Sequence, residues 1–144
     1  MIAPERREDG RAIIEFIALG VILLIPLTYL VLTMARLQAG AFSASLAGRE
    51  AARVFVSAST DAGAHQRAQA AARLAFEDFA FDGAATVTAA CDGSPCLRPD
   101  GRITTTASVS VPLPLIPDIV AAHLPTSITL TSTHLQVVDR FVAR

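Results

Sequence analysis

The sequence contains no lysine and no asparagine, and only 17% of its 144 residues are charged. A soluble domain is about 25% charged on average, so this composition favours a membrane protein. Without asparagine there is no acceptor site for N-linked glycans. The net charge of −1 gives no overall field that would attract nucleic acid. The length allows one small domain and hardly two.

Motifs of catalysis are missing as well. There is no glycine-rich phosphate loop, no G-x-S-x-G elbow and no HExxH zinc motif, and basic residues do not alternate with aromatic ones as in nucleic-acid-binding modules. Asp61 and His65, one helical turn apart, form a candidate ligand pair, but such a pair is typical of a solvated helix face. We therefore predict a protein that is not an enzyme and has no cofactor, no metal, no small-molecule substrate and no direct nucleic-acid partner.

Two cysteines, Cys91 and Cys96, enclose the turn-forming residues Asp-Gly-Ser-Pro. Two thiols are too few for a structural zinc site, which takes about four ligands. In an exported domain this spacing favours a disulfide that closes a turn. A redox-active pair is the alternative, and it has less support because the spacing exceeds that of C-x-x-C motifs and only Arg98 stands nearby to activate a thiol.

Residues 12–35 form a long apolar run. About 20 apolar residues span a bilayer, whereas the apolar region of a cleavable secretory signal has about 7–15, so we expect a permanent transmembrane helix. Positive charges are denser before the run than after it, which predicts a cytoplasmic N-terminus and an extracytoplasmic C-terminal region. The arginines that decide this are Arg6, Arg7 and Arg11 before the run and Arg36 after it.

Two residues depart from the apolar pattern of this run. Pro26, near its middle, removes a backbone donor and is expected to kink the helix, unless it only reflects the frequency of proline in membrane helices. Glu15, near its start, places a carboxylate where full insertion costs up to roughly 2–3 kcal/mol. Glu15 therefore either extends to the interface, four residues beyond Arg11, or has a function of its own.

The residues around Glu15 resemble a known processing site. The segment Gly10-Arg-Ala-Ile-Ile-Glu15-Phe16 follows a charged leader and resembles the prepilin peptidase site of type IV pilins and pseudopilins. The resemblance implies cleavage after Gly10, with Arg11 as the mature N-terminus, where the family usually has a small or apolar residue. It also makes Glu15 the assembly residue, whose carboxylate pairs with the new α-amino group of a neighbouring subunit, with Phe16 next to it.

A helical pattern continues past the apolar run as far as Val56. Gly40, Ala44 and Gly48 recur every four residues, a spacing that lets helices approach closely, unless it belongs to a generic alanine-rich helix. The segment Arg49-Glu50-Ala51-Ala52-Arg53 then resembles the R-E-A-A-R segment of TadE-like proteins, small pseudopilins of the tight-adherence (Flp-type) pilus. The resemblance implies that the partners are the membrane, a prepilin peptidase and other pilin-like or assembly-platform proteins.

The remainder of the chain predicts one more helix and a small antiparallel sheet. Residues 62–79 have the spacing of an amphipathic helix, and the candidate caps just before them are Ser59, Thr60 and Asp61. Residues 84–91 and 103–111 have the period of strands. A third strand starts at Ile128, and its apolar parity then changes, which predicts a bulge at residues 132–134. The expected apolar face of the second helix consists of Ala68, Ala71, Ala72, Ala75, Phe76 and Phe79.

An apolar, proline-rich segment at residues 112–125 connects the last two predicted strands. The segment is expected to be a crossover loop packed on the helix. The alternative is a docking surface for another pilus component, because exposed apolar side chains of this kind would form an adhesive patch.

These features predict an α+β, pilin-like fold in four parts. They are a prepilin-type leader at residues 1–10, a transmembrane helix at 11–36, an extracytoplasmic helical region at 37–82 and a small β-sheet region at 83–144. The resemblance implies a minor pseudopilin that takes part in the assembly of a Tad/Flp-type IV pilus. The alternative is an uncleaved single-pass anchor in the cytoplasmic membrane that presents a small binding module outside the cytoplasm.

Overall fold

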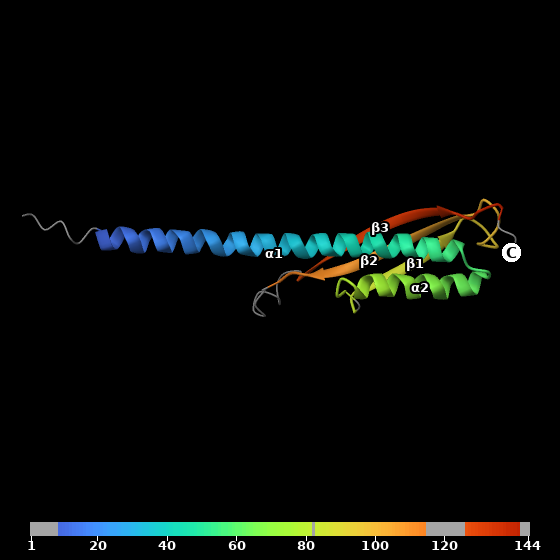
Figure 1. Cartoon of the computed structure of the whole chain (residues 1–144), viewed down its shortest axis with the longest axis horizontal. Helices are drawn as coiled ribbons and strands as arrows, with labels where there is room; N and C mark the ends of the chain where they lie inside the picture. The colour runs from blue at the N-terminus through green and yellow to red at the C-terminus, as the bar shows by residue number, and fades with distance from the viewer. Residues whose placement is uncertain (1–8, 82, 115–125, 142–144) are drawn as a thin grey trace, which may run out of the picture.

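The protein, seen in a computed structural model, consists of one long helix with a second helix and a sheet packed against its far half (Figure 1). The structure describes residues 9–81, 83–114 and 126–141. Most of the predicted leader, and most of the proline-rich segment that was expected to be a loop or a docking surface, lie outside these residues. The predicted α+β architecture is confirmed, with the long helix, the second helix and an antiparallel sheet in the expected order.

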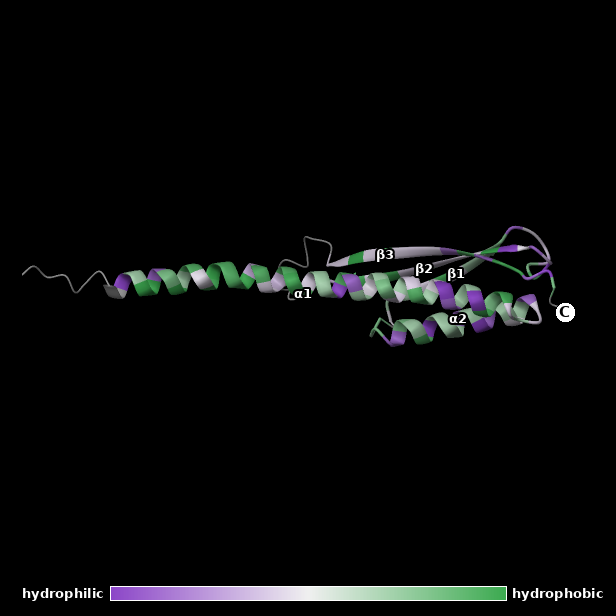
Figure 2. Cartoon of the chain, turned by 45° about the horizontal axis from the view of Figure 1, so that its top comes forward, coloured by the Kyte–Doolittle hydropathy of each residue, from purple (hydrophilic) through white to green (hydrophobic). Residues whose placement is uncertain are grey.

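Helix α1 spans Asp9–Val56, 48 residues, which at 1.5 Å per residue is about 72 Å. It ends at the predicted residue and continues without interruption through Pro26. Its first half carries large aliphatic side chains, and none of the most apolar stretch is buried against described parts of the chain. In Figure 2, most residues of this first half have the green colour of hydrophobic residues. The helix is long and apolar enough to cross a membrane once.

Helix α2 spans Asp61–Glu77 and folds back along the second half of α1 (Figure 1). Thr60 caps it, because the Thr60 side-chain oxygen accepts a hydrogen bond from the Gly63 N–H at 3.2 Å. Four alanines and a phenylalanine form its buried face. Of the predicted face, Ala71 and Phe79 are only half-buried. The buried residues are Ala64, Ala68, Ala72, Ala75 and Phe76.

The sheet has the strand order β1-β2-β3 and is antiparallel throughout. Strand β1 spans Ala85–Cys91, β2 spans Arg102–Pro112 and β3 spans Ser127–Val137. The predicted period of two in β2 is confirmed, since its odd-numbered residues from Ile103 to Val111 are buried towards the helices. The opposite face of the sheet is rich in threonine and serine and faces solvent.

The predicted bulge in β3 is wrong. Strand β3 pairs with β2 residue for residue from one end to the other. Leu135 therefore lies on the outer face and is 60% exposed, while Ser132 and His134 occupy inner positions. The reason lies in α1: a Cβ on Gly48 would come within 2.8 Å of the His134 ring, so the absence of a side chain at Gly48 leaves room for a polar ring beneath the sheet.

Candidate functional site

The residues of the predicted processing and assembly site lie at the start of α1. Gly10 is in the first turn, where backbone N–H groups have no partner within the helix. Arg11, Glu15 and Phe16 are exposed on the helix surface. Arg11 and Glu15 are four residues apart and so share one side of the helix. The only neighbours that the described chain gives these side chains are others on the same helix, so lipid or another chain is left to cover them.

The small residues of α1 lie where the helix meets the sheet. A Cβ on Gly40 would collide with Cγ2 of Val111 and would stand 3.2 Å from Cδ1 of Leu130. Ala44, one turn further, is 1% exposed and belongs to the core. Gly48 lies against the sheet in the same way. These small residues therefore allow α1 and the sheet to approach each other closely. Their predicted role in packing one helix against another is a separate matter and stays a prediction.

A buried hydrogen bond fastens this contact between α1 and the sheet. Thr105 of β2 is fully buried, and its hydroxyl donates to the carbonyl oxygen of Gly48 at 2.8 Å. A buried hydroxyl without a partner is costly, so this bond fixes the sheet at one height along the helix. Sequence reasoning placed Thr105 in a strand but had no signal for its partner, because 57 positions separate the two residues.

The segment Arg49–Arg53 divides between two faces of α1. Ala51 and Ala52 are buried in the protein, whereas Arg49 and Arg53 point outwards. Nη2 of Arg53 lies 2.8 Å from Oε2 of Glu50. Beside them runs a groove of about 550 Å³ between α1 and β3. Its lining consists of Leu46, Arg49, Glu50, Ala52, Arg53, His134, Leu135 and Gln136.

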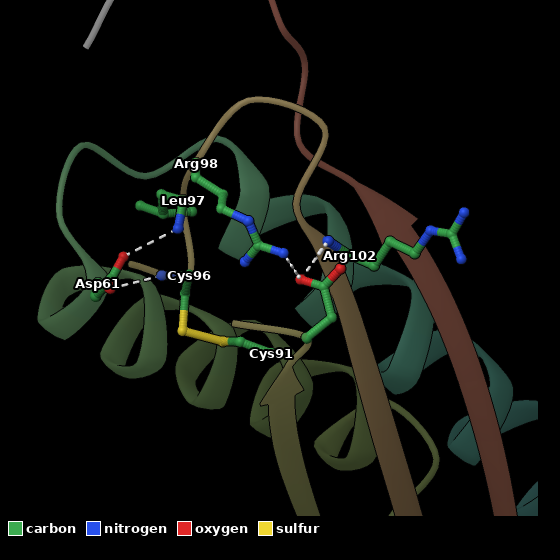
Figure 3. Close-up of a disulfide and its surroundings, with 7 residues drawn as sticks. Asp61, Cys91, Cys96, Leu97, Arg98 and Arg102 are labelled. Carbon is green, nitrogen blue, oxygen red and sulfur yellow. Dashed lines mark hydrogen bonds and ion pairs between the residues drawn. A yellow bond between two sulfur atoms is a disulfide. The ribbon is translucent and has the colours of Figure 1, made fainter. Parts of the chain in front are cut away.

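The two cysteines form the predicted disulfide, and the loop it closes is tied to α2 (Figure 3). The Asp61 carboxylate accepts hydrogen bonds from the backbone N–H groups of Cys96, at 2.9 Å, and of Leu97, at 3.2 Å. Asp61 was weighed in the sequence as a helix cap and as a metal ligand. Its contact with the loop had no sequence signal, because the partners are more than 30 positions away.

A second carboxylate, on Asp92, holds the other side of this loop. Its Oδ1 accepts the Arg102 backbone N–H at 3.0 Å and lies 2.8 Å from Nη2 of Arg98. The backbone hydrogen bond from Arg102, and after it the positive charge of Arg98, lower the pKa of Asp92. Together, Asp61 and Asp92 make the disulfide loop a part of the folded unit at the end of the molecule away from the apolar half of α1.

Chemistry at the histidines is limited by what stands around them. His65 packs edge-on against Phe55, with ring centroids 4.9 Å apart. The Nε2 of His134 lies 3.2 Å from the Ser132 hydroxyl, but in the described part of the chain no carboxylate hydrogen-bonds to this ring. Among residues 9–81, 83–114 and 126–141, no group of three or more metal-binding side chains comes together.

Comparisons with protein-family models, with curated proteins and with solved structures found no match to this chain.

Proposed function

We propose that this chain is a TadE-like minor pseudopilin, cut after Gly10 by a prepilin peptidase and assembled with other pilin-like or assembly-platform proteins in the cytoplasmic membrane. The observation that carries the proposal is the placement of the Gly10–Phe16 segment. It lies at the start of a single helix whose first part is exposed over a length that could cross a membrane. The second part of the same helix packs against α2 and the sheet. A helix of this kind needs a lateral partner or lipid along its first half.

The disulfide supports the orientation that the arginines predict. Disulfides persist in oxidising compartments, so the region that contains Cys91 and Cys96 belongs outside the cytoplasm. The N-terminus, with Gly10, then lies on the cytoplasmic side, which is where the family's peptidase cuts. The proposal requires that Gly10 lies on the cytoplasmic side and that the disulfide lies outside the cytoplasm.

The test is the intact mass of the protein extracted from its native membrane, with and without the prepilin peptidase gene. We expect a chain that starts at Arg11 only when the peptidase is present. As a matched control, Gly20→Ala changes a glycine in the same helix that touches nothing within 4 Å, so it should be processed normally, while Gly10→Leu should not. A chain that keeps Met1–Gly10 in both strains would refute the proposal and favour the uncleaved anchored binding module.

The role proposed for Glu15 predicts that replacing this residue impairs pilus assembly without impairing membrane insertion of the chain. A Glu15→Leu variant removes a costly carboxylate from the apolar helix, so membrane insertion should be at least as efficient as before. If Glu15 pairs with a neighbour's α-amino group, pilus formation should be abolished, as measured by counting pili on cells. Normal piliation by this variant would contradict the role. Glu77→Leu, at an exposed position at the end of α2, serves as the control for loss of a carboxylate.

A further inference from the structure

We propose that the free edge of β3, with the groove beside it, is a docking site for an extended, carboxylate-bearing segment of a different protein, which adds to the sheet as a fourth strand. The juxtaposition that carries this inference is an open strand edge next to two outward-pointing arginines of α1. The inference does not depend on cleavage after Gly10. The docking site can therefore be absent while the proposed function is correct, and the docking site can be present while the proposed function is wrong.

One side of the β3 backbone pairs with no other strand among the described residues. Leu113 donates its N–H to Thr126 O, and Val138 donates to Gly101 O, each at 2.8 Å, so the even-numbered residues of β3 bond to β2. In an antiparallel pair the alternate residues direct their N–H and C=O groups away from the partner. The residues whose backbone groups therefore point to the open edge are Ser127, Thr129, Thr131, Thr133, Leu135 and Val137, and all six are exposed.

Within residues 9–81, 83–114 and 126–141, this edge also lacks the usual devices against pairing with another chain. Proteins protect sheet edges with short strands, charged side chains, proline, bulges or a covering element. Strand β3 is 11 residues long, has no charged residue, glycine or proline, and has no bulge. The opposite edge is shorter, because β1 has only 7 residues. An open, regular edge of this kind is a template for an added strand.

The groove beside the edge determines the chemistry of the added strand. The side chains of a fourth strand that face inwards would enter the groove next to α1, whose apolar floor includes Leu46 and Ala52. Arg49 and Arg53 flank this floor, and Glu50 offsets only one of the two charges. The groove therefore has a surplus positive charge, and a strand with an inward-facing Asp or Glu would complement it.

A second copy of this chain is a poor occupant for two reasons. None of the strands β1, β2 and β3 contains an Asp or Glu that could meet Arg49 and Arg53. In addition, β3 runs beside α1 in the same direction (Figures 1 and 2). An antiparallel pair of β3 strands would put the two apolar half-helices at opposite ends, where one bilayer cannot hold both.

The experiment uses the full chain in its native membrane, with photoreactive benzoylphenylalanine at Gln136, an exposed residue that lines the groove. Cross-linked peptides are sequenced by mass spectrometry. We expect an adduct with another protein, through a segment that contains Asp or Glu. Arg49→Glu should lower its yield about tenfold, because a like charge then faces the partner's carboxylate. The control is Arg73→Glu on α2, which makes the same change of charge at an exposed arginine that does not line the groove.

A second pair of variants tests the backbone edge itself. Thr133→Pro removes an N–H that points to the open edge and should also lower the yield about tenfold. Ala89→Pro removes the corresponding outward N–H from β1, on the other edge, and should leave the yield unchanged. If the adduct is a second copy of this chain or lipid alone, if no adduct forms, or if Arg49→Glu and Arg73→Glu behave alike, the proposal is overturned. Because Arg49→Glu changes only the surface, it decides the matter even if Thr133→Pro disturbs the sheet.

Discussion

The two halves of α1 share one helical backbone and differ in the size and surroundings of their side chains. From Arg11 to Arg36 the helix carries large aliphatic residues that stay exposed, such as Leu23, 71% exposed. From Leu37 to Val56 its covered positions are almost all glycine, alanine or serine. Lipid accepts any apolar shape, whereas a packed protein surface accepts only side chains that fit the space it leaves.

The comparison teaches that apolar character alone does not tell the two halves apart. The first half has to satisfy its backbone within the helix and present apolar surface, which leucine and isoleucine do well. The second half has to lie close to a sheet on one side and to α2 on another, which demands small residues. A substitution of the same kind should therefore have opposite consequences in the two halves.

The largest effect is expected from Gly40→Leu. The new Cβ would collide with Val111, whose branched side chain has little freedom to move, so α1 and the sheet have to separate locally. Overpacking of this kind lowers the free energy of unfolding by about 1–3 kcal/mol. This loss outweighs the gain in helix propensity that comes from replacing glycine. Hydrogen exchange of the β2 amides in detergent micelles measures the loss of stability.

Gly20→Leu is the matched change in the first half. A Cβ on Gly20 meets nothing within 4 Å, so this variant should leave the stability of the sheet unchanged and should strengthen the helix. If Gly20→Leu destabilised β2 as much as Gly40→Leu, the division of α1 into a lipid half and a packed half would be wrong.

A smaller effect is expected from Thr105→Val, which keeps the shape of the side chain and removes the hydroxyl bonded to Gly48. Loss of one buried hydrogen bond should lower the free energy of unfolding by about 1 kcal/mol. Thr33→Val is the matched change in the first half, where the hydroxyl bonds only to the Tyr29 carbonyl one turn back in the same helix. Chemical denaturation of both variants should show a loss for Thr105→Val alone; equal losses would mean that the Gly48 bond does not hold the sheet in place.

The same contrast explains what could be predicted from the sequence. The long helix, the second helix and two of the strands follow from local periodicity, and their bounds were close to those observed. The error in β3 arose because Ser132 and His134 look like outward residues. They face inwards only because Gly48 of α1 leaves them room, which no local pattern records. The contacts of Asp61 and Thr105 were missed for the same reason, since each joins segments far apart in the chain.

The smallest effect is expected from acid, and it should be confined to the folded unit that packs on the second half of α1. No ion pair is found among described residues 11–36, whereas Asp92 pairs with Arg98 and accepts the Arg102 N–H. These interactions lower the pKa of Asp92 below its ordinary value of 3.8. The stabilisation is therefore fully present above about pH 4 and is lost as the pH falls through the lower pKa of the folded protein.

The measurement is an NMR titration of the Arg102 amide signal below about pH 4. In the wild type this signal should move as Asp92 takes up a proton, because the hydrogen bond from Arg102 to Oδ1 then weakens. In Asp92→Asn, which cannot titrate, the movement should disappear, while Asp78→Asn at the end of α2 should leave it intact. A titration that survives in Asp92→Asn would show that the acid response of the loop comes from another carboxylate, and Asp61, which holds the Cys96 and Leu97 amides, would be the next to replace.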